Sequence, residues 1–90
     1  MKIVAVCGMG IGTSIILKMN TEKAAQRLGM DAEVEVADIG TAMGAAATAD
    51  LVLTSAEFAE ELTGLAVPVV VVTNFTSIDE IADKLAAHGH

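Results

Sequence analysis

Residues 2–28 place a short apolar run, a glycine-rich segment and a helical pattern directly one after another. The run at 2–6 has the length and composition of a buried strand. Cys7 and three alternating glycines follow, and from residue 13 to 28 apolar side chains recur at helical spacing. A strand, a tight loop and a helix in this order begin a β-α-β unit, which predicts an α/β fold.

The rest of the chain repeats the alternation of strand and helix. Strands are expected at 33–37, 50–54 and 67–72, and helices at 42–47, 56–62 and 78–87. Such an alternation implies right-handed crossovers and a parallel sheet covered on both faces. The strands at 2–6 and 50–54 are the apolar ones expected in the centre, whereas 33–37 alternates polar and apolar residues and is expected at an edge. We therefore predict one domain, residues 1–90, with the architecture of an α/β three-layer sandwich: a four-stranded parallel sheet of order 2-1-3-4 flanked by helices.

The helix expected at 13–28 carries an apolar stripe on one side. The stripe consists of Leu17, Ala24 and Leu28, with Ile16 and Met19 beside it. The residues expected to face water are Lys18, Glu22, Lys23, Gln26 and Arg27. Gly29 follows where a residue that tolerates positive φ commonly ends a helix.

Two later helices begin with the spacing of a capping box, in which a hydroxyl and a carboxylate three residues on satisfy each other's backbone amides. Thr54 and Glu57 have this spacing before the helix at 56–62, with Ser55 as an alternative cap. Ser77 and Glu80 have it before the last helix.

Composition excludes several classes of function. Twelve acidic and five basic residues give a net charge of −7, which disfavours binding to nucleic acid or to an anionic membrane. The single cysteine cannot form an internal disulfide, and no zinc-ligand spacing exists. The first apolar run is too short for a signal peptide or a membrane span. We expect a cytoplasmic protein without metal or cofactor.

The loop after the first strand has the features of a phosphate site. A cysteine at a helix N-terminus has a lowered pKa, because free N–H groups and the helix dipole favour its thiolate. Gly8, Gly10 and Gly12 allow successive amides to turn toward one anion. Thr13 and Ser14 add hydroxyl donors. These parts predict a phosphoryl group carried on Cys7, although a lone cysteine at a strand end can also be a small buried hydrophobe.

Other phosphate-binding loops fit this sequence less well. A Walker loop needs a lysine that Gly12-Thr13-Ser14 lacks, and a dinucleotide fingerprint needs glycine at position 13. Low-molecular-weight tyrosine phosphatases place an arginine where Thr13 stands, and Arg27, the only arginine, lies far along the helix. Without a bidentate guanidinium to hold the transferring group, phosphatase turnover is disfavoured.

Two segments resemble the IIB components of the bacterial phosphoenolpyruvate-dependent sugar phosphotransferase system, and the resemblance is strongest to the ascorbate-type members of the galactitol/ascorbate/lactose-like group. The segments are residues 2–14 (KIVAVCGMGIGTS), continued by Leu17-Lys18-Met19, and residues 33–38 (EVEVAD). The resemblance implies the fold related to low-molecular-weight tyrosine phosphatases, and a phosphocysteine carrier.

In that family the active cysteine, here Cys7, accepts a phosphoryl group from a phosphohistidine on a IIA protein. It passes the group to a sugar held by a membrane IIC partner. The resemblance further implies that the loop holding the phosphate consists of Gly8, Met9, Gly10, Ile11, Gly12, Thr13 and Ser14. Ascorbate is the expected sugar, although the membrane component largely selects it.

Several other residues are weaker candidates for a role. Met9 and Ile11 are expected to form part of a docking surface for both partners or, alternatively, to fold into the core. Lys18 and Lys23 could steer an acidic partner or be solvated helix charges. Asp38 and Ser55 follow strand ends, and His88 and His90 lie at a terminus expected to be frayed. The alternatives to a carrier are a regulatory or redox-sensing thiol module and a degenerate phosphatase.

Overall fold

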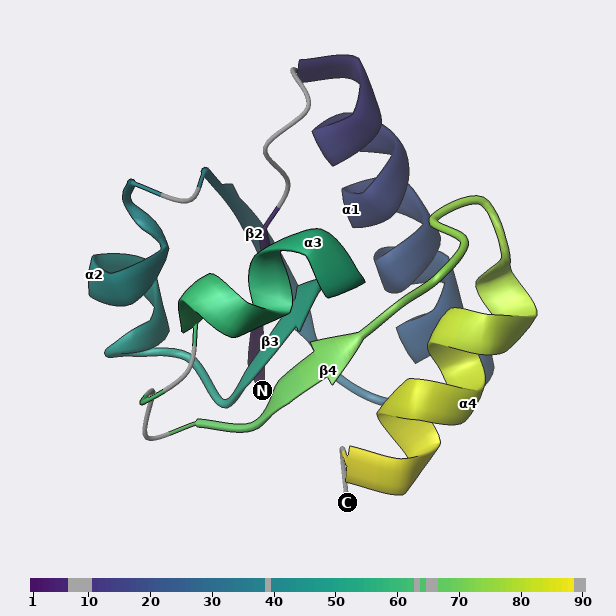
Figure 1. The fold of residues 1–90 in the computed structure, drawn as a ribbon. Coiled ribbons are helices and arrows are strands. Elements are labelled where there is room, and N and C mark those ends of the chain that lie inside the picture. Colours follow the sequence, from purple (N-terminus) through teal and green to yellow (C-terminus); the bar gives the residue numbers. More distant parts are fainter. Residues whose placement is uncertain (7–10, 39, 63, 65–66, 89–90) are drawn as a thin grey trace.

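The computed structural model describes residues 1–6, 11–38, 40–62, 64 and 67–88. Strands and helices alternate along the chain (Figure 1). The elements in chain order are β1 (Lys2–Val6), α1 (Ile11–Arg27), β2 (Glu33–Ala37), α2 (Ala42–Ala46), β3 (Leu51–Thr54), α3 (Ala56–Ala59), the 3-10 turn η1 (Glu60–Leu62), β4 (Val69–Val71) and α4 (Ile78–His88).

The sheet has the predicted order, β2-β1-β3-β4, and every pairing is parallel. The two strands predicted to be central, β1 and β3, do lie in the centre, and β2 forms an edge. Leu51, Val52 and Leu53 of β3 are all fully buried. A strand covered on both faces must be apolar at successive positions, which explains why these runs do not alternate.

Helices cover both faces of the sheet (Figure 1). Alternate residues of β1 point to opposite cores, since Ile3 packs in one and Val4 in the other. The first core lies under α1 and α4 and contains Ile3, Ala5, Leu17, Ala24, Ala25, Val34, Leu51, Leu53, Val70, Val72, Ile81, Ala82 and Leu85. The second lies under α2 and η1 and contains Val4, Val6, Ala37, Ala42, Ala46, Ala49, Val52 and Leu62. The predicted three-layer sandwich is therefore confirmed.

Helix α1 begins two residues earlier than predicted and buries only part of its apolar sequence. Leu17 and Ala24 are fully buried, but Ile16 and Met19 are 44% and 49% exposed. Gly29 follows the helix with φ of 69°, so the predicted left-handed termination is confirmed.

The two predicted capping boxes differ from expectation. The first does not form, because the hydroxyl of Thr54 donates to the carbonyl of Val6, and the N-cap residue Ser55 makes no side-chain cap bond. The second forms in one direction only. The amide of Glu80 donates to Ser77 Oγ at 3.2 Å, whereas the Glu80 carboxylate accepts from Thr73 and Asn74.

Candidate functional site

The candidate site lies at the carboxyl end of β1, between two elements that the structure fixes firmly. β1 ends at Val6 and α1 begins at Ile11. The chain leaves β1 toward β2 across one face of the sheet, and reaches β3 through α2 on the other face. The gap between β1 and β3 is thus the topological switch point, where α/β sheets of this kind bind ligands.

Half of the predicted site, Cys7 and the first three residues of the phosphate loop, falls outside the described part of the chain. Cys7, Gly8, Met9 and Gly10 are not among the described residues. The last four residues of the loop, Ile11, Gly12, Thr13 and Ser14, form the first turn of α1. The backbone therefore carries the second half of the predicted loop at a helix N-terminus, whose first four N–H groups have no acceptor within the helix.

Thr54 lies beside the switch point and links the strands around it, a role that was not expected from the sequence. Its side chain is fully buried, and Oγ1 donates to the carbonyl oxygen of Val6 at 3.2 Å. Its own carbonyl accepts the amide of Val72 at 2.8 Å. One residue thus ties together the ends of β1, β3 and β4. The sequence did contain an indication of this role, since Thr54 is a hydroxyl residue at the end of an otherwise apolar central strand, and a buried hydroxyl needs a hydrogen-bond partner.

The loop between β4 and α4 lies at the same edge of the sheet and is held by a carboxylate. Glu80 accepts hydrogen bonds from the amide of Thr73 (2.8 Å), the hydroxyl of Thr73 (2.8 Å) and the amide of Asn74 (2.9 Å). These hydrogen bonds lower the pKa of Glu80, and the bond from the Thr73 amide has the largest effect.

The same loop is tied to α1. Asn20 Nδ2 donates to the carbonyl oxygen of Phe75 at 2.8 Å, and this contact is partly buried. Further along, Arg27 forms an exposed ion pair with Asp79 of α4. The side of α1 that faces α4 is thus occupied by contacts within the molecule, which leaves the opposite side for solvent.

Asp38 and Ser55, the two candidates that follow strand ends, lie in local turns and caps. The Asp38 carboxylate accepts from the amide of Thr41 at 2.9 Å and from its hydroxyl at 3.0 Å, which is the geometry of a turn-forming aspartate. Ser55 is the half-buried N-cap residue of α3. Neither side chain is shown holding anything beyond its own turn.

Lys2 lies at the opposite end of β1. Its Nζ is 2.9 Å from Glu35 Oε2 and donates to Thr48 Oγ1 at 3.0 Å. The hydrogen bond that Lys2 donates to the Glu35 carboxylate is the main cause of a raised Lys2 pKa. This cluster stabilises the amino edge of the sheet and stands apart from the switch point.

Within the described ranges, no three histidine, cysteine, aspartate or glutamate side chains gather as they would around a metal ion. None of the described helices is long and apolar enough to cross a membrane.

Comparison with known proteins identifies the family. The model of the family described as "PTS system, Lactose/Cellobiose specific IIB subunit" matches residues 2–87. The chain belongs to this family. The match includes β1, the loop that follows it and all of α1, so the candidate site lies inside the matched region.

Two known proteins are similar over nearly the whole chain. The ascorbate-specific PTS system EIIB component of Mycoplasma pneumoniae (strain ATCC 29342 / M129 / Subtype 1) is 34% identical over 85 residues, covering 93% of this chain and 90% of that protein. The structure of the lactose-specific IIB component domain from Streptococcus pneumoniae superposes with a TM-score of 0.77 at 16% identity, covering 100% of this chain and 98% of that one. The second likeness establishes the IIB fold, and the resemblance inferred from the sequence is confirmed.

Proposed function

We propose that this IIB protein carries a phosphoryl group on Cys7, accepting it from a phosphohistidine of a IIA protein and passing it to a sugar bound by a membrane IIC protein. The observation that carries the proposal is the position of the only cysteine in the sequence. It directly follows the last residue of the central strand β1, at the switch point, and four residues before α1 begins.

The chemistry follows from that position. The Cys7 thiolate attacks phosphorus, the new S–P bond forms as the P–N bond breaks, and the electron pair of that bond returns to the imidazole nitrogen of the donor. A sugar hydroxyl then attacks phosphorus, the S–P bond breaks with its electrons returning to sulfur, and the hydroxyl proton passes to solvent. Both steps depend on in-line positioning and charge stabilisation more than on further covalent groups.

The start of α1 supplies charge stabilisation at the place where it is needed. The helix spans Ile11–Arg27, so its dipole adds a partial positive charge at the loop. Free amides of the first turn, together with those of residues 8–10, would hold the phosphate, and the Thr13 and Ser14 hydroxyls would add donors. An anion on sulfur is favoured before transfer and after it.

We propose ascorbate as the sugar and the cytoplasm as the location. The support for ascorbate is the Mycoplasma pneumoniae relative, which is 34% identical, whereas the lactose-specific domain shares only 16% of its residues with this chain. Offering the phosphorylated chain to membranes that contain an ascorbate-type, a lactose-type or a cellobiose-type IIC protein, each supplied with its own sugar, would discriminate between them. Loss of phosphate from the carrier with ascorbate alone is the expected result.

Intact-mass measurement tests the carrier function. The chain is incubated with phosphoenolpyruvate, the upstream phosphodonors and a IIA protein that phosphorylates the Mycoplasma pneumoniae relative in a parallel reaction. One added phosphate, absent in Cys7→Ser and labile as a thiophosphate is, supports the proposal. No added phosphate under conditions that phosphorylate the relative would refute it, and would favour a regulatory thiol module.

A further inference from the structure

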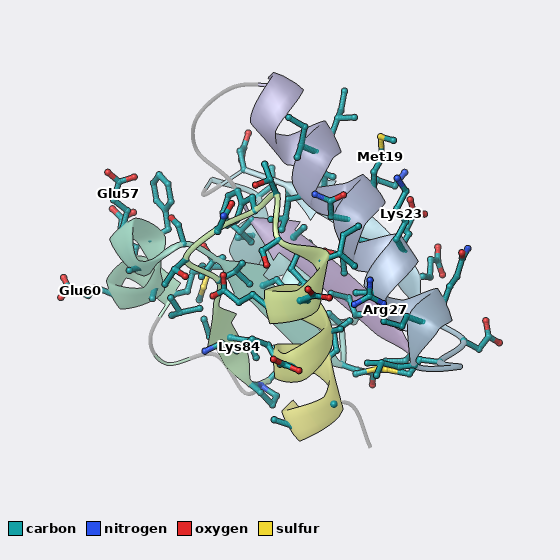
Figure 2. The ribbon with its side chains drawn as sticks, turned by 90° about the vertical axis from the view of Figure 1, so that its right-hand side faces the viewer. Met19, Lys23, Arg27, Glu57, Glu60 and Lys84 are labelled. Carbon is teal, nitrogen blue, oxygen red and sulfur yellow. The ribbon has the colours of Figure 1, made fainter. Side chains whose placement is uncertain are left out.

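The solvent-facing side of α1 carries large apolar side chains that the described elements leave about half exposed. Ile15 and Met19 are each 49% exposed, and Ile16 is 44% exposed. Residues four apart in a helix are neighbours on its surface, so Ile15, Met19 and Lys23 form one row, with Ile16 beside it. Figure 2 shows Met19 and Lys23 pointing outward together from α1. We call Ile15, Ile16, Met19 and Lys23 the α1 outer face.

The basic residues of the chain are concentrated on this same helix. Three of the five lysines and arginines, Lys18, Lys23 and Arg27, lie on α1, which has one acidic residue, Glu22. Arg27 is paired with Asp79. Lys23 lies among the apolar side chains and Lys18 beside them, with Glu22 on the same side of the helix, so this side keeps a net positive charge in a protein whose net charge is −7.

Negative charge gathers elsewhere. Glu57, Glu60 and Glu61 lie on α3 and η1, which contain no basic residue. In Figure 2 the labelled Glu57 and Glu60 lie at the opposite side of the molecule from Met19 and Lys23. This acidic segment thus lies away from the α1 outer face, and such a separation of charge helps to orient a charged partner.

We propose that the α1 outer face is the docking surface for the phosphodonor, and that the donor presents an apolar surface edged with carboxylates. This inference rests on the proposed function, since it names the partner of Cys7. Ile15 lies one turn after the start of α1, which is itself only four residues after Cys7. A protein that delivers phosphate to that cysteine must cover the surface around the start of this helix.

Charge decides the nature of the occupant. Lys18 and Lys23 place positive charge at the α1 outer face in an acidic protein, so they attract carboxylates at the edge of a partner, whereas a basic partner would be drawn to the acidic surface elsewhere. The patch is also small and half-exposed, as expected for a partner that must dissociate after each transfer and not for a permanent interface. The donor therefore binds transiently, with an association rate that depends on salt.

The test compares initial rates of phosphoryl transfer from the IIA protein to wild type, Ile15→Glu, Met19→Glu and Met43→Glu. Met43 is the matched control, because it is also an exposed helical methionine, 54% accessible, but lies on α2. We expect kcat/KM to fall about tenfold or more in the two α1 variants and to stay within about twofold in Met43→Glu. Equal rates in all four proteins would overturn the proposal.

Three further measurements make the result specific. Alkylation of Cys7 by iodoacetamide should be equally fast in all variants, and a change in Met19→Glu would assign its defect to the loop and overturn docking. Lys23→Glu should lower the transfer rate mostly at low salt.

The chain alone should be monomeric on sedimentation. A dimer that Met19→Glu dissociates would show that the occupant of the α1 outer face is a second copy of this chain and not the donor. If wild type accepts no phosphate, the proposed function fails, and direct binding of the IIA protein still tests the surface.

Discussion

The hydroxyl of Thr54 donates a hydrogen bond to the carbonyl oxygen of Val6, 48 positions earlier, at 3.2 Å and out of contact with water. Val6 is the last residue of β1, and Cys7 follows it directly. The Thr54 carbonyl also accepts a hydrogen bond from the amide of Val72. The end of β1, which Cys7 follows, is therefore held by β3, and β3 is held in turn by the end of β4. The chemistry proposed for Cys7 therefore starts from a rigid support.

Replacing Thr54 with valine should destabilise the fold and disturb the cysteine. The Val6 carbonyl would lose its buried partner, which costs about 1–3 kcal/mol of unfolding free energy. Thr54→Ser keeps the hydroxyl and should recover most of that loss. Urea unfolding measures stability, and alkylation of Cys7 measures the loop. If valine and serine variants are equally stable, the hydrogen bond has no net role.

Glu80 predicts how stability changes in acid. Its hydrogen bonds to Thr73 and Asn74 lower its pKa in the folded protein relative to the unfolded chain. A carboxyl whose pKa is lowered by folding stabilises the protein at pH values above its pKa in the unfolded chain. That contribution is lost as the pH falls through the folded-state pKa. Wild type should therefore exceed Glu80→Gln in stability at neutral pH, and the two curves should converge in acid. Denaturant unfolding over a pH series checks this, and a constant difference would contradict it.

Two exposed glycines should respond in opposite directions to alanine. Gly29 has φ of 69°, which is strained for a residue with a Cβ even though nothing lies within 4 Å of that atom. Gly29→Ala should cost about 1–2 kcal/mol. Gly44 lies within α2, without positive φ and with equal open space. Gly44→Ala should add up to about 1 kcal/mol, because alanine is the better helix former. Thermal unfolding of both variants measures the contrast, and changes of the same sign would contradict it.

Two contacts of α1 should differ widely in their contribution to stability. Arg27 and Asp79 form an ion pair with side chains 52% and 84% exposed, and Arg27→Gln should change stability by less than about 1 kcal/mol. Leu17 is fully buried in the core under α1 and α4, and Leu17→Ala should cost about 2–5 kcal/mol. Denaturant unfolding at two salt concentrations separates them. A large, salt-dependent loss in Arg27→Gln would show that the pair is stronger than surface pairs generally are.

Local pattern predicted the order of the elements and the place of the site. Apolar strands that alternate with helical segments can bury their side chains only in a layered sheet, so β1 and β3 were expected in the centre. The glycine-rich segment after β1 was expected to lead into a helix, and α1 begins at Ile11. The resemblance to IIB proteins came from the same segment. Whether Cys7 and the loop to Gly10 hold phosphate stays a prediction.

Periodicity alone did not settle which apolar residues of α1 are covered. Leu17 and Met19 both belong to or flank the apolar stripe, yet one is fully buried and the other is half-exposed. Burial depends on where α4 and the sheet lie against the helix, and the sequence of α1 alone does not specify which elements pack against it. The α1 outer face therefore became visible only in the folded molecule.

The sequence by itself determined the sheet order, the helix ends such as Gly29 and the position of the only cysteine, because these follow from short-range periodicity and backbone preference. Only the tertiary structure decided the partners of the polar side chains. Thr54 and Glu80 both have local capping patterns, but Thr54 bonds to Val6 and the Glu80 carboxylate to Thr73. A buried or strand-end amide or carbonyl without a partner costs more than an exposed helix cap left to water, so the distant partner wins over the local one.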